Sequence, residues 1–184
     1  MATAVGFAGT PPNAGDFRLG LTFTDSSHVL GAQGPTASPS VYRYTGFSGA
    51  SGTLVASPTI PDPAGATADR LLSYNVLAGN ALLAVQSIGD SYVSIYDVTD
   101  PAAPVWLVSG NNTVTPAANG NGTGQLAWGD ISYDPASGRW SQTLYALSSN
   151  QGIQAFVVTI PEPGVGALAL LGLGLLACWR KLRA

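Results

Sequence analysis

The stretch at residues 91–101, SYVSIYDVTDP, shows the clearest strand pattern in this chain. Its even-numbered residues from Tyr92 to Val98 fall on one side of an extended backbone, and its odd-numbered residues from Val93 to Asp97 fall on the other. This period of two is typical of a β-strand in a sheet. Proline cannot donate to a ladder of hydrogen bonds, so the strand is predicted to stop at the Thr-Asp-Pro that closes the stretch.

Two further stretches repeat the order of this one. In each of the three, a short apolar run is followed by a turn rich in Gly, Ser, Asn or Asp and then by an alternating strand. The predicted pairs of strands are His28–Ala32 with Ser40–Thr45, Ala81–Val85 with Tyr92–Val98, and Thr143–Leu147 with Gly152–Val158. A turn between two strands is also predicted at residues 134–138, Asp-Pro-Ala-Ser-Gly.

The composition of residues 1–160, the body, agrees with this pattern. The body contains no Glu and no Lys, the common residues of helix surfaces. It is rich in Thr, Ser, Val, Tyr, Gly and Asn, which favour strands and turns. We therefore predict an all-β body. Its nine Asp and four Arg make it acidic, which argues against nucleic-acid binding.

The middle copy resembles the repeats of bacterial extracellular β-propellers that contain I-Y-D-[VI]-[ST]-[DN]-P. The resemblance covers residues 17–160 and is specific only in that copy. It implies that each predicted pair is the middle hairpin of a four-stranded blade. A closed propeller needs at least about four blades, and the chain offers about three, so we expect an incomplete propeller. A two-sheet β-sandwich of short strands is the alternative.

The N-terminal residues, MATAVGFAGT, carry neither a basic segment nor an apolar run of signal-peptide length. We therefore expect either that translation starts further upstream or that the chain is the C-terminal piece of a longer protein.

The body offers few residues for catalysis or metal binding. His28 is the only His and Cys178 the only Cys, so neither a disulfide framework nor a His/Cys metal cluster is predicted, and no cofactor is expected. His28 is expected to be structural or simply exposed. Five Asp are predicted to cap or form turns rather than to bind calcium: Asp16, Asp25, Asp97, Asp100 and Asp130.

Exposed aromatic side chains are a second class of candidates, because they can stack on sugars. Packing in the core and in hairpins is the expected role instead. The candidates are Tyr42, Tyr44, Trp106, Trp128, Tyr133 and Trp140.

The last 24 residues, 161–184, differ from the body, and we call them the tail. No charged residue occurs from Pro163 to Trp179, a run of 17 residues that would be about 25 Å long as a helix. This is at the short end of the range that spans a bilayer. The run is apolar all round and is followed by a basic cluster, which favours a transmembrane helix with its end in the cytoplasm over a buried core helix.

The order Pro-Glu-Pro, apolar run, basic end resembles the PEP-CTERM protein-sorting domain. The resemblance covers residues 161–184 and implies export, anchoring in the bacterial inner membrane, and processing by an exosortase-type enzyme on the way to the cell envelope or surface. It implies that Pro161, Glu162 and Pro163 are the sorting signal, which two prolines keep extended and out of sheets and helices. It also implies a membrane anchor formed by Val165, Leu168, Leu170, Leu171, Leu173, Leu175, Leu176 and Trp179. The implied basic stop is formed by Arg180, Lys181 and Arg183.

Taken together, these features predict a non-enzymatic cell-surface or extracellular-matrix protein. Exopolysaccharide is an expected partner, since proteins of the PEP-CTERM type often occur in bacteria that make a polysaccharide matrix. The alternative is a fragment of a β-propeller enzyme or carbohydrate-binding module that carries the same tail.

Overall fold

A computed structural model describes residues 6–7, 20–32, 42–48, 51–56, 58–60, 69–87, 92–111, 124–148 and 152–161. These residues form β-strands, turns and short connections, and no helix occurs among them. The prediction of an all-β body is therefore confirmed for the part that the structure describes.

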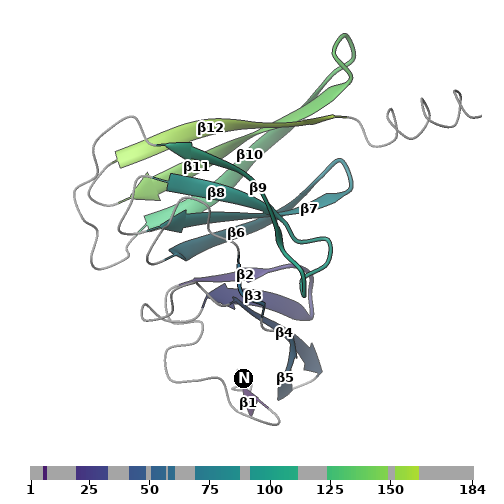
Figure 1. Cartoon of the computed structure of the whole chain (residues 1–184), viewed down its shortest axis with the longest axis vertical. Helices are drawn as coiled ribbons and strands as arrows, with labels where there is room; N and C mark the ends of the chain where they lie inside the picture. The colour runs from purple at the N-terminus through teal and green to yellow at the C-terminus, as the bar shows by residue number, and fades with distance from the viewer. Residues whose placement is uncertain are drawn as a thin grey trace, which may run out of the picture.

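The strands form three sheets, which follow one another along the chain (Figure 1). The first sheet contains β1 (Gly6–Phe7), β2 (Leu21–Phe23), β3 (His28–Ala32), β4 (Tyr42–Ser48) and β5 (Ser51–Ala56). The second contains β6 (Asp69–Leu77), β7 (Asn80–Ser87), β8 (Tyr92–Asp97) and β9 (Val105–Asn111). The third contains β10 (Gly124–Asp134), β11 (Arg139–Ser148) and β12 (Gly152–Pro161).

Each sheet is an antiparallel meander in which the next strand of the chain pairs on the outer side of the previous one. The orders are β2-β3-β4-β5, β6-β7-β8-β9 and β10-β11-β12, and β1 adds to β5 in parallel. The three pairs of strands predicted from sequence are β3 with β4, β7 with β8, and β11 with β12. All three pairs are the second and third strands of their sheets, so the sequence repeat corresponds to a structural one.

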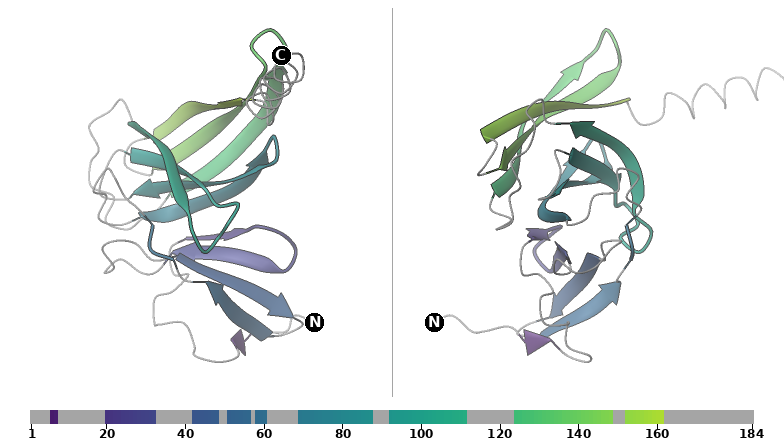
Figure 2. Two further views of the ribbon diagram at one scale, coloured as in Figure 1. Left: turned by 45° about the vertical axis from the view of Figure 1, so that its right-hand side comes forward. Right: turned by 60° about the vertical axis from the view of Figure 1, so that its left-hand side comes forward.

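The sheets stack face to face, and their first strands lie close together (Figures 1 and 2). The backbone N–H of Tyr74 in β6 donates to Thr22 Oγ1 in β2 at 3.0 Å. On the other side of β6, Trp128 Nε1 in β10 donates to the carbonyl of Ser73 at 3.3 Å. Residues of β2, β6 and β10 also line a shared cavity of about 370 Å³. The first strands of the three meanders, β2, β6 and β10, therefore lie together around this cavity.

The middle strands of the second sheet, β7 and β8, are buried on both faces, because this sheet lies between the other two. Leu82 and Leu83 are adjacent in β7, point to opposite faces, and are both fully buried. One apolar cluster joins the first and second sheets through Leu30, Ile60, Leu72, Leu83, Val85, Tyr96 and Val98. The other joins the second and third sheets through Leu71, Leu77, Leu82, Ala84, Val93, Ile95, Leu126, Leu144 and Ala146. The alternation predicted for β8 is confirmed by this division.

The described residues form neither a closed propeller nor a closed barrel. They also differ from the alternative prediction of a sandwich, which has two sheets rather than three. Patterns of alternation identify strands but do not determine how many sheets the strands form. The number of sheets depends on which consecutive strands pair with each other.

The predicted transmembrane helix of the tail falls on residues that lie outside the described part of the chain. Among the described residues, no helix is long and apolar enough to span a bilayer.

Candidate functional site

The strand β12 leads directly into the Pro-Glu-Pro signal. Its last residue, Pro161, lies opposite Arg139, the first residue of β11. The prediction that the prolines keep this segment out of any sheet is therefore wrong for Pro161. A proline is tolerated at this position because it ends the strand at the edge of a sheet, where its missing N–H removes no ladder bond from the strand interior.

The rest of the signal, Glu162 and Pro163, lies outside the described residues, as do the predicted anchor and the basic stop. The structure does show the position of Pro161, the first residue of the tail. The tail follows the outermost strand of the third sheet, at the same end as the β10–β11 turn (Figure 1).

The described part of the chain is thus a set of β-sheets whose last strand runs into the Pro-Glu-Pro segment. The particular signal is shown by comparison with known families, since residues 159–184 match the model of the PEP-CTERM protein-sorting motif. Such a motif marks a protein that is exported and undergoes membrane-associated sorting by an exosortase-type system. Comparison with curated proteins gave no significant match.

A cluster of Asp25, Ser27 and His28 occupies the turn between β2 and β3. Both carboxylate oxygens of Asp25 lie 2.9–3.0 Å from His28 Nδ1. Ser27 Oγ lies 3.2 Å from the same nitrogen and donates to Asp25 Oδ1 at 2.9 Å. The imidazole also stacks on the Tyr44 ring, with 5.3 Å between centroids and 12° between planes. Sequence reasoning missed this cluster, although its signal, Asp-Ser-Ser-His, is local.

The three residue types match a serine hydrolase triad, but their geometry does not. In a triad the Ser hydroxyl and the carboxylate contact different ring nitrogens, so that the ring accepts a proton on one side while it is oriented from the other. Here Ser27 and Asp25 share Nδ1. The Nε2 side of the ring faces Gly46, where an added Cβ would lie 3.2 Å from Nε2. The cluster therefore acts as a turn that holds β2 and β3 together.

Asp25 should make folding sensitive to acid. The backbone N–H of Ser27 donates to its carboxylate at 2.7 Å and is the main cause that holds the pKa of Asp25 below its ordinary value of 3.8. A carboxyl with a lowered pKa in the folded state stabilises the fold above its unfolded pKa, and this contribution is lost as the pH falls through the folded pKa. We expect Asp25→Asn, which keeps an acceptor but cannot titrate, to reduce the loss of unfolding free energy between pH 6 and pH 2. Urea denaturation at both pH values measures it, and an unchanged loss would contradict the assignment.

The other predicted turn aspartates are Asp97, Asp100, Asp130 and Asp16. Asp97 and Asp100 cap turns as predicted, because their Oδ1 atoms accept from the N–H of Thr99 at 2.8 Å and of Ala102 at 2.9 Å. Asp130 is not a turn residue but lies within β10. It falls in an irregular stretch between Trp128 and Ile131, where the register with β11 shifts.

Asp16 lies outside the described residues. Among the described residues, no group of three or more His, Cys, Asp or Glu side chains is arranged to hold a metal ion.

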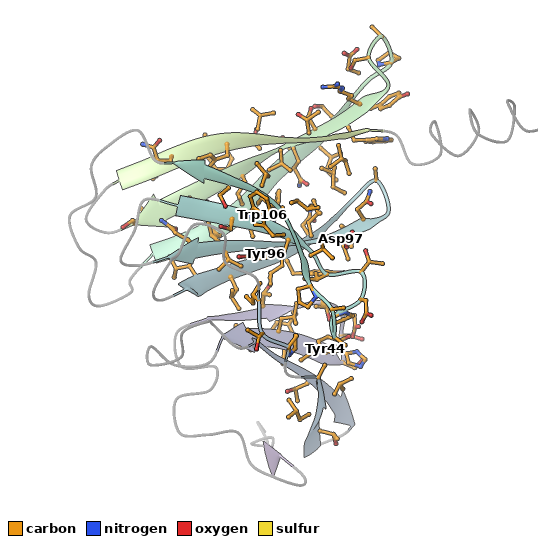
Figure 3. The ribbon with its side chains drawn as sticks, viewed as in Figure 1. Tyr44, Tyr96, Asp97 and Trp106 are labelled. Atoms are coloured by element: carbon orange, nitrogen blue, oxygen red, sulfur yellow. The ribbon has the colours of Figure 1, made fainter. Side chains whose placement is uncertain are left out.

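The candidate aromatic residues are distributed over all three sheets and do not form one platform. Figure 3 shows Tyr44 on the first sheet and Trp106 on β9 of the second. Trp106 Nε1 donates to Ser109 Oγ at 3.0 Å, and Trp128 packs against the cluster between the second and third sheets. Tyr133 and Trp140 pair across β10 and β11, with centroids 4.7 Å apart. The side chain of Tyr42 lies outside the described part. Packing is thus the role that these contacts support.

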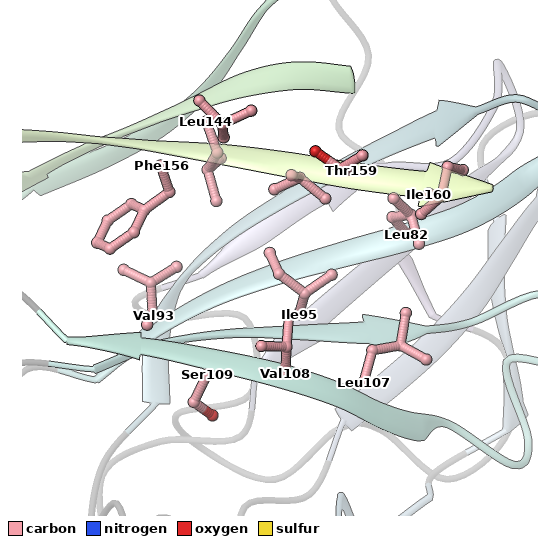
Figure 4. Close-up of a pocket in the computed structure, with 13 residues that line it drawn as sticks. Leu82, Val93, Ile95, Leu107, Val108, Ser109, Leu144, Phe156, Thr159 and Ile160 are labelled. Carbon is pink, nitrogen blue, oxygen red and sulfur yellow. The ribbon is translucent and has the colours of Figure 1, made fainter. Parts of the chain in front are cut away.

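A cleft of about 510 Å³ lies between the outer strands of the second and third sheets (Figure 4). Its walls are β7, β8 and β9 on one side and β11 and β12 on the other. Among the described residues that line it, none is charged, and Ser109 and Thr159 supply the only side-chain hydroxyls. Figure 4 shows Val93, Ile95, Leu107 and Val108 facing Leu144, Phe156 and Ile160 across this space. Sequence patterns gave no indication of the cleft.

Proposed function

We propose that the chain is a non-enzymatic exported protein that its tail holds in the bacterial inner membrane until an exosortase-type enzyme processes it. The observation that carries this proposal is the match of residues 159–184 to the sorting motif. The charge pattern supports it independently, because an uncharged run is followed by Arg180, Lys181 and Arg183 at the end of the chain.

In this proposal each part of the tail has a physical role. The processing enzyme recognises Pro161, Glu162 and Pro163. Val165–Trp179 forms the membrane helix, since a helix satisfies every backbone group within its own segment. The basic residues that follow remain in the cytoplasm, so that the body lies on the outer side of the membrane.

The body is proposed to serve as a surface or matrix module built like a sector of a β-propeller. Three features support this: each sheet is a meander, the predicted hairpins occupy equivalent positions, and the first strands meet on one side. Exopolysaccharide is the proposed partner. The alternative is a fragment of a propeller enzyme or carbohydrate-binding module.

Deleting residues 161–184 tests the anchor. In a bacterial host that exports the body, we expect the full chain in the membrane pellet and the shortened chain in the soluble fraction. Washing the pellet with carbonate at high pH separates an inserted helix from a body that only adheres. An unchanged distribution after the deletion would overturn the proposal.

A further inference from the structure

The third sheet has one strand fewer than the second. Among the described residues, β12 pairs only with β11, so its outer edge offers backbone groups for another strand. This edge is ten residues long, pairs with β11 without a register shift, and carries no charged residue. Natural edge strands are usually protected by charges, bulges or prolines, whereas here the only proline is the last residue.

The cleft lies where a fourth strand of the third sheet would lie. Consecutive residues 156–160 of β12 and 107–110 of β9, the fourth strand of the second sheet, line this cleft, and Leu107 and Val108 remain 43% and 50% exposed. A strand paired with β12 would cover them. It would need apolar side chains on the face toward β9, because none of the described lining residues can neutralise a charge.

We propose that, in the absence of a membrane, the first part of the tail docks on β12 as the fourth strand of the third sheet. The topology points to this occupant. From β2 onward, each strand within a sheet pairs with the outer edge of the strand before it, and the segment that follows β12 is the tail. Pro161-Glu162-Pro163-Gly164 has the composition of a tight connection, so the chain reverses there and runs antiparallel to β12.

The tail has the length and the chemistry that the site requires. Twenty-three residues follow Pro161, and those from Val165 to Trp179 are uncharged. A partner strand as long as β12 uses residues 165–174, so the basic residues at 180–183 stay outside the cleft. In an extended backbone, Leu168 and Leu170 point to one face and Leu171 and Leu173 to the other. Either register therefore directs leucine into the cleft.

The docked strand and the membrane helix compete for the same residues. In water, docking buries one face of an apolar segment that would otherwise be exposed. In a bilayer, the helix places all of its surface in hydrocarbon and satisfies its whole backbone, so lipid shifts the equilibrium toward the released tail. The cleft would thus shield the tail before insertion. This inference is independent of the anchor proposal, since it concerns the state without lipid.

Photocrosslinking of the full chain tests the docking. Cys178 is first replaced (Cys178→Ser), and Val108→Cys is then labelled with a benzophenone maleimide. Val55→Cys, on the first sheet, is the matched control, because Val55 is exposed to a similar extent, 57% against 50%. The dilute, lipid-free protein is irradiated and the products are mapped by mass spectrometry. The experiment is repeated with phosphatidylethanolamine/phosphatidylglycerol vesicles.

We expect intramolecular crosslinks from position 108 to peptides within residues 165–174, at least about fivefold above those from position 55. We also expect vesicles to reduce them. Either no excess over the control or crosslinks only between two chains would overturn the docking proposal. A yield that stays unchanged although the protein sediments with the vesicles through its tail would overturn the competition between docking and insertion. Sedimentation of the same samples with the vesicles reports on anchoring separately, so failure of one proposal does not imply failure of the other.

Discussion

Replacing Leu83 with alanine is expected to lower the free energy of unfolding by about 2–5 kcal/mol, the usual range for removing a fully buried leucine. Leu83 is 0% exposed and belongs to the cluster between the first and second sheets. The substitution removes apolar contacts with both sheets at once and leaves a cavity that stacked sheets can only partly close. Urea denaturation followed by tryptophan fluorescence and circular dichroism measures the change.

Leu54→Ala is the matched control for this prediction. Leu54 lies on β5 of the first sheet and is 43% exposed, so we expect the same truncation there to cost below about 1 kcal/mol. Equal losses at the two positions would show that the first and second sheets do not stack as described. The same result would remove the main support for a body built of three packed meanders.

Replacing Leu171 with arginine is expected to release most of the protein from the membrane. Leu171 is at the centre of the uncharged run from Pro163 to Trp179. An arginine at the middle of a membrane helix costs about 2.5–3.5 kcal/mol, and the lost leucine adds about 0.5 kcal/mol. A penalty of this size corresponds to roughly a hundredfold or greater change in partition. The ratio of protein in carbonate-washed membranes to protein in the soluble fraction measures it.

Leu171→Ile is the control, because it preserves hydrophobicity and leaves Pro161, Glu162 and Pro163 intact. We expect its distribution to match that of the unchanged chain. If Leu171→Arg also stayed in the washed membranes, the segment would not be held by hydrocarbon. The membrane role assigned to the tail would then have to be abandoned, while the description of the body would stand.

Much of the local structure follows from the sequence. The alternation from Tyr92 to Val98 predicts β8, and the turn composition at residues 134–138 predicts the β10–β11 connection. These features depend on neighbouring residues, since successive side chains of a strand point to opposite faces wherever the strand packs. The Asp97 and Asp100 caps were predictable for the same reason, because each side chain binds an N–H two residues further along.

The sorting signal is also a property of the sequence itself. An uncharged run is followed by Arg180, Lys181 and Arg183. Its tendency to enter lipid does not depend on tertiary structure, because partition into lipid depends on composition and length. The place of Asp130 within a strand was less predictable. A single Asp beside Gly is typical of a turn, and only the partner strand β11 shows that the backbone stays extended there.

The sequence by itself thus determined the strands, the turns and the chemical division between body and tail, because each depends on neighbouring residues. Tertiary contacts, by contrast, determine that the described strands form three stacked sheets, that β12 is the last described strand of the third sheet, and that a cleft without charged side chains among its described residues lies beside β12. Those features depend on packing between residues such as Leu82 and Leu144, which belong to one apolar cluster although they are far apart in the chain. Alternation along one strand carries no information about which other strand will face it.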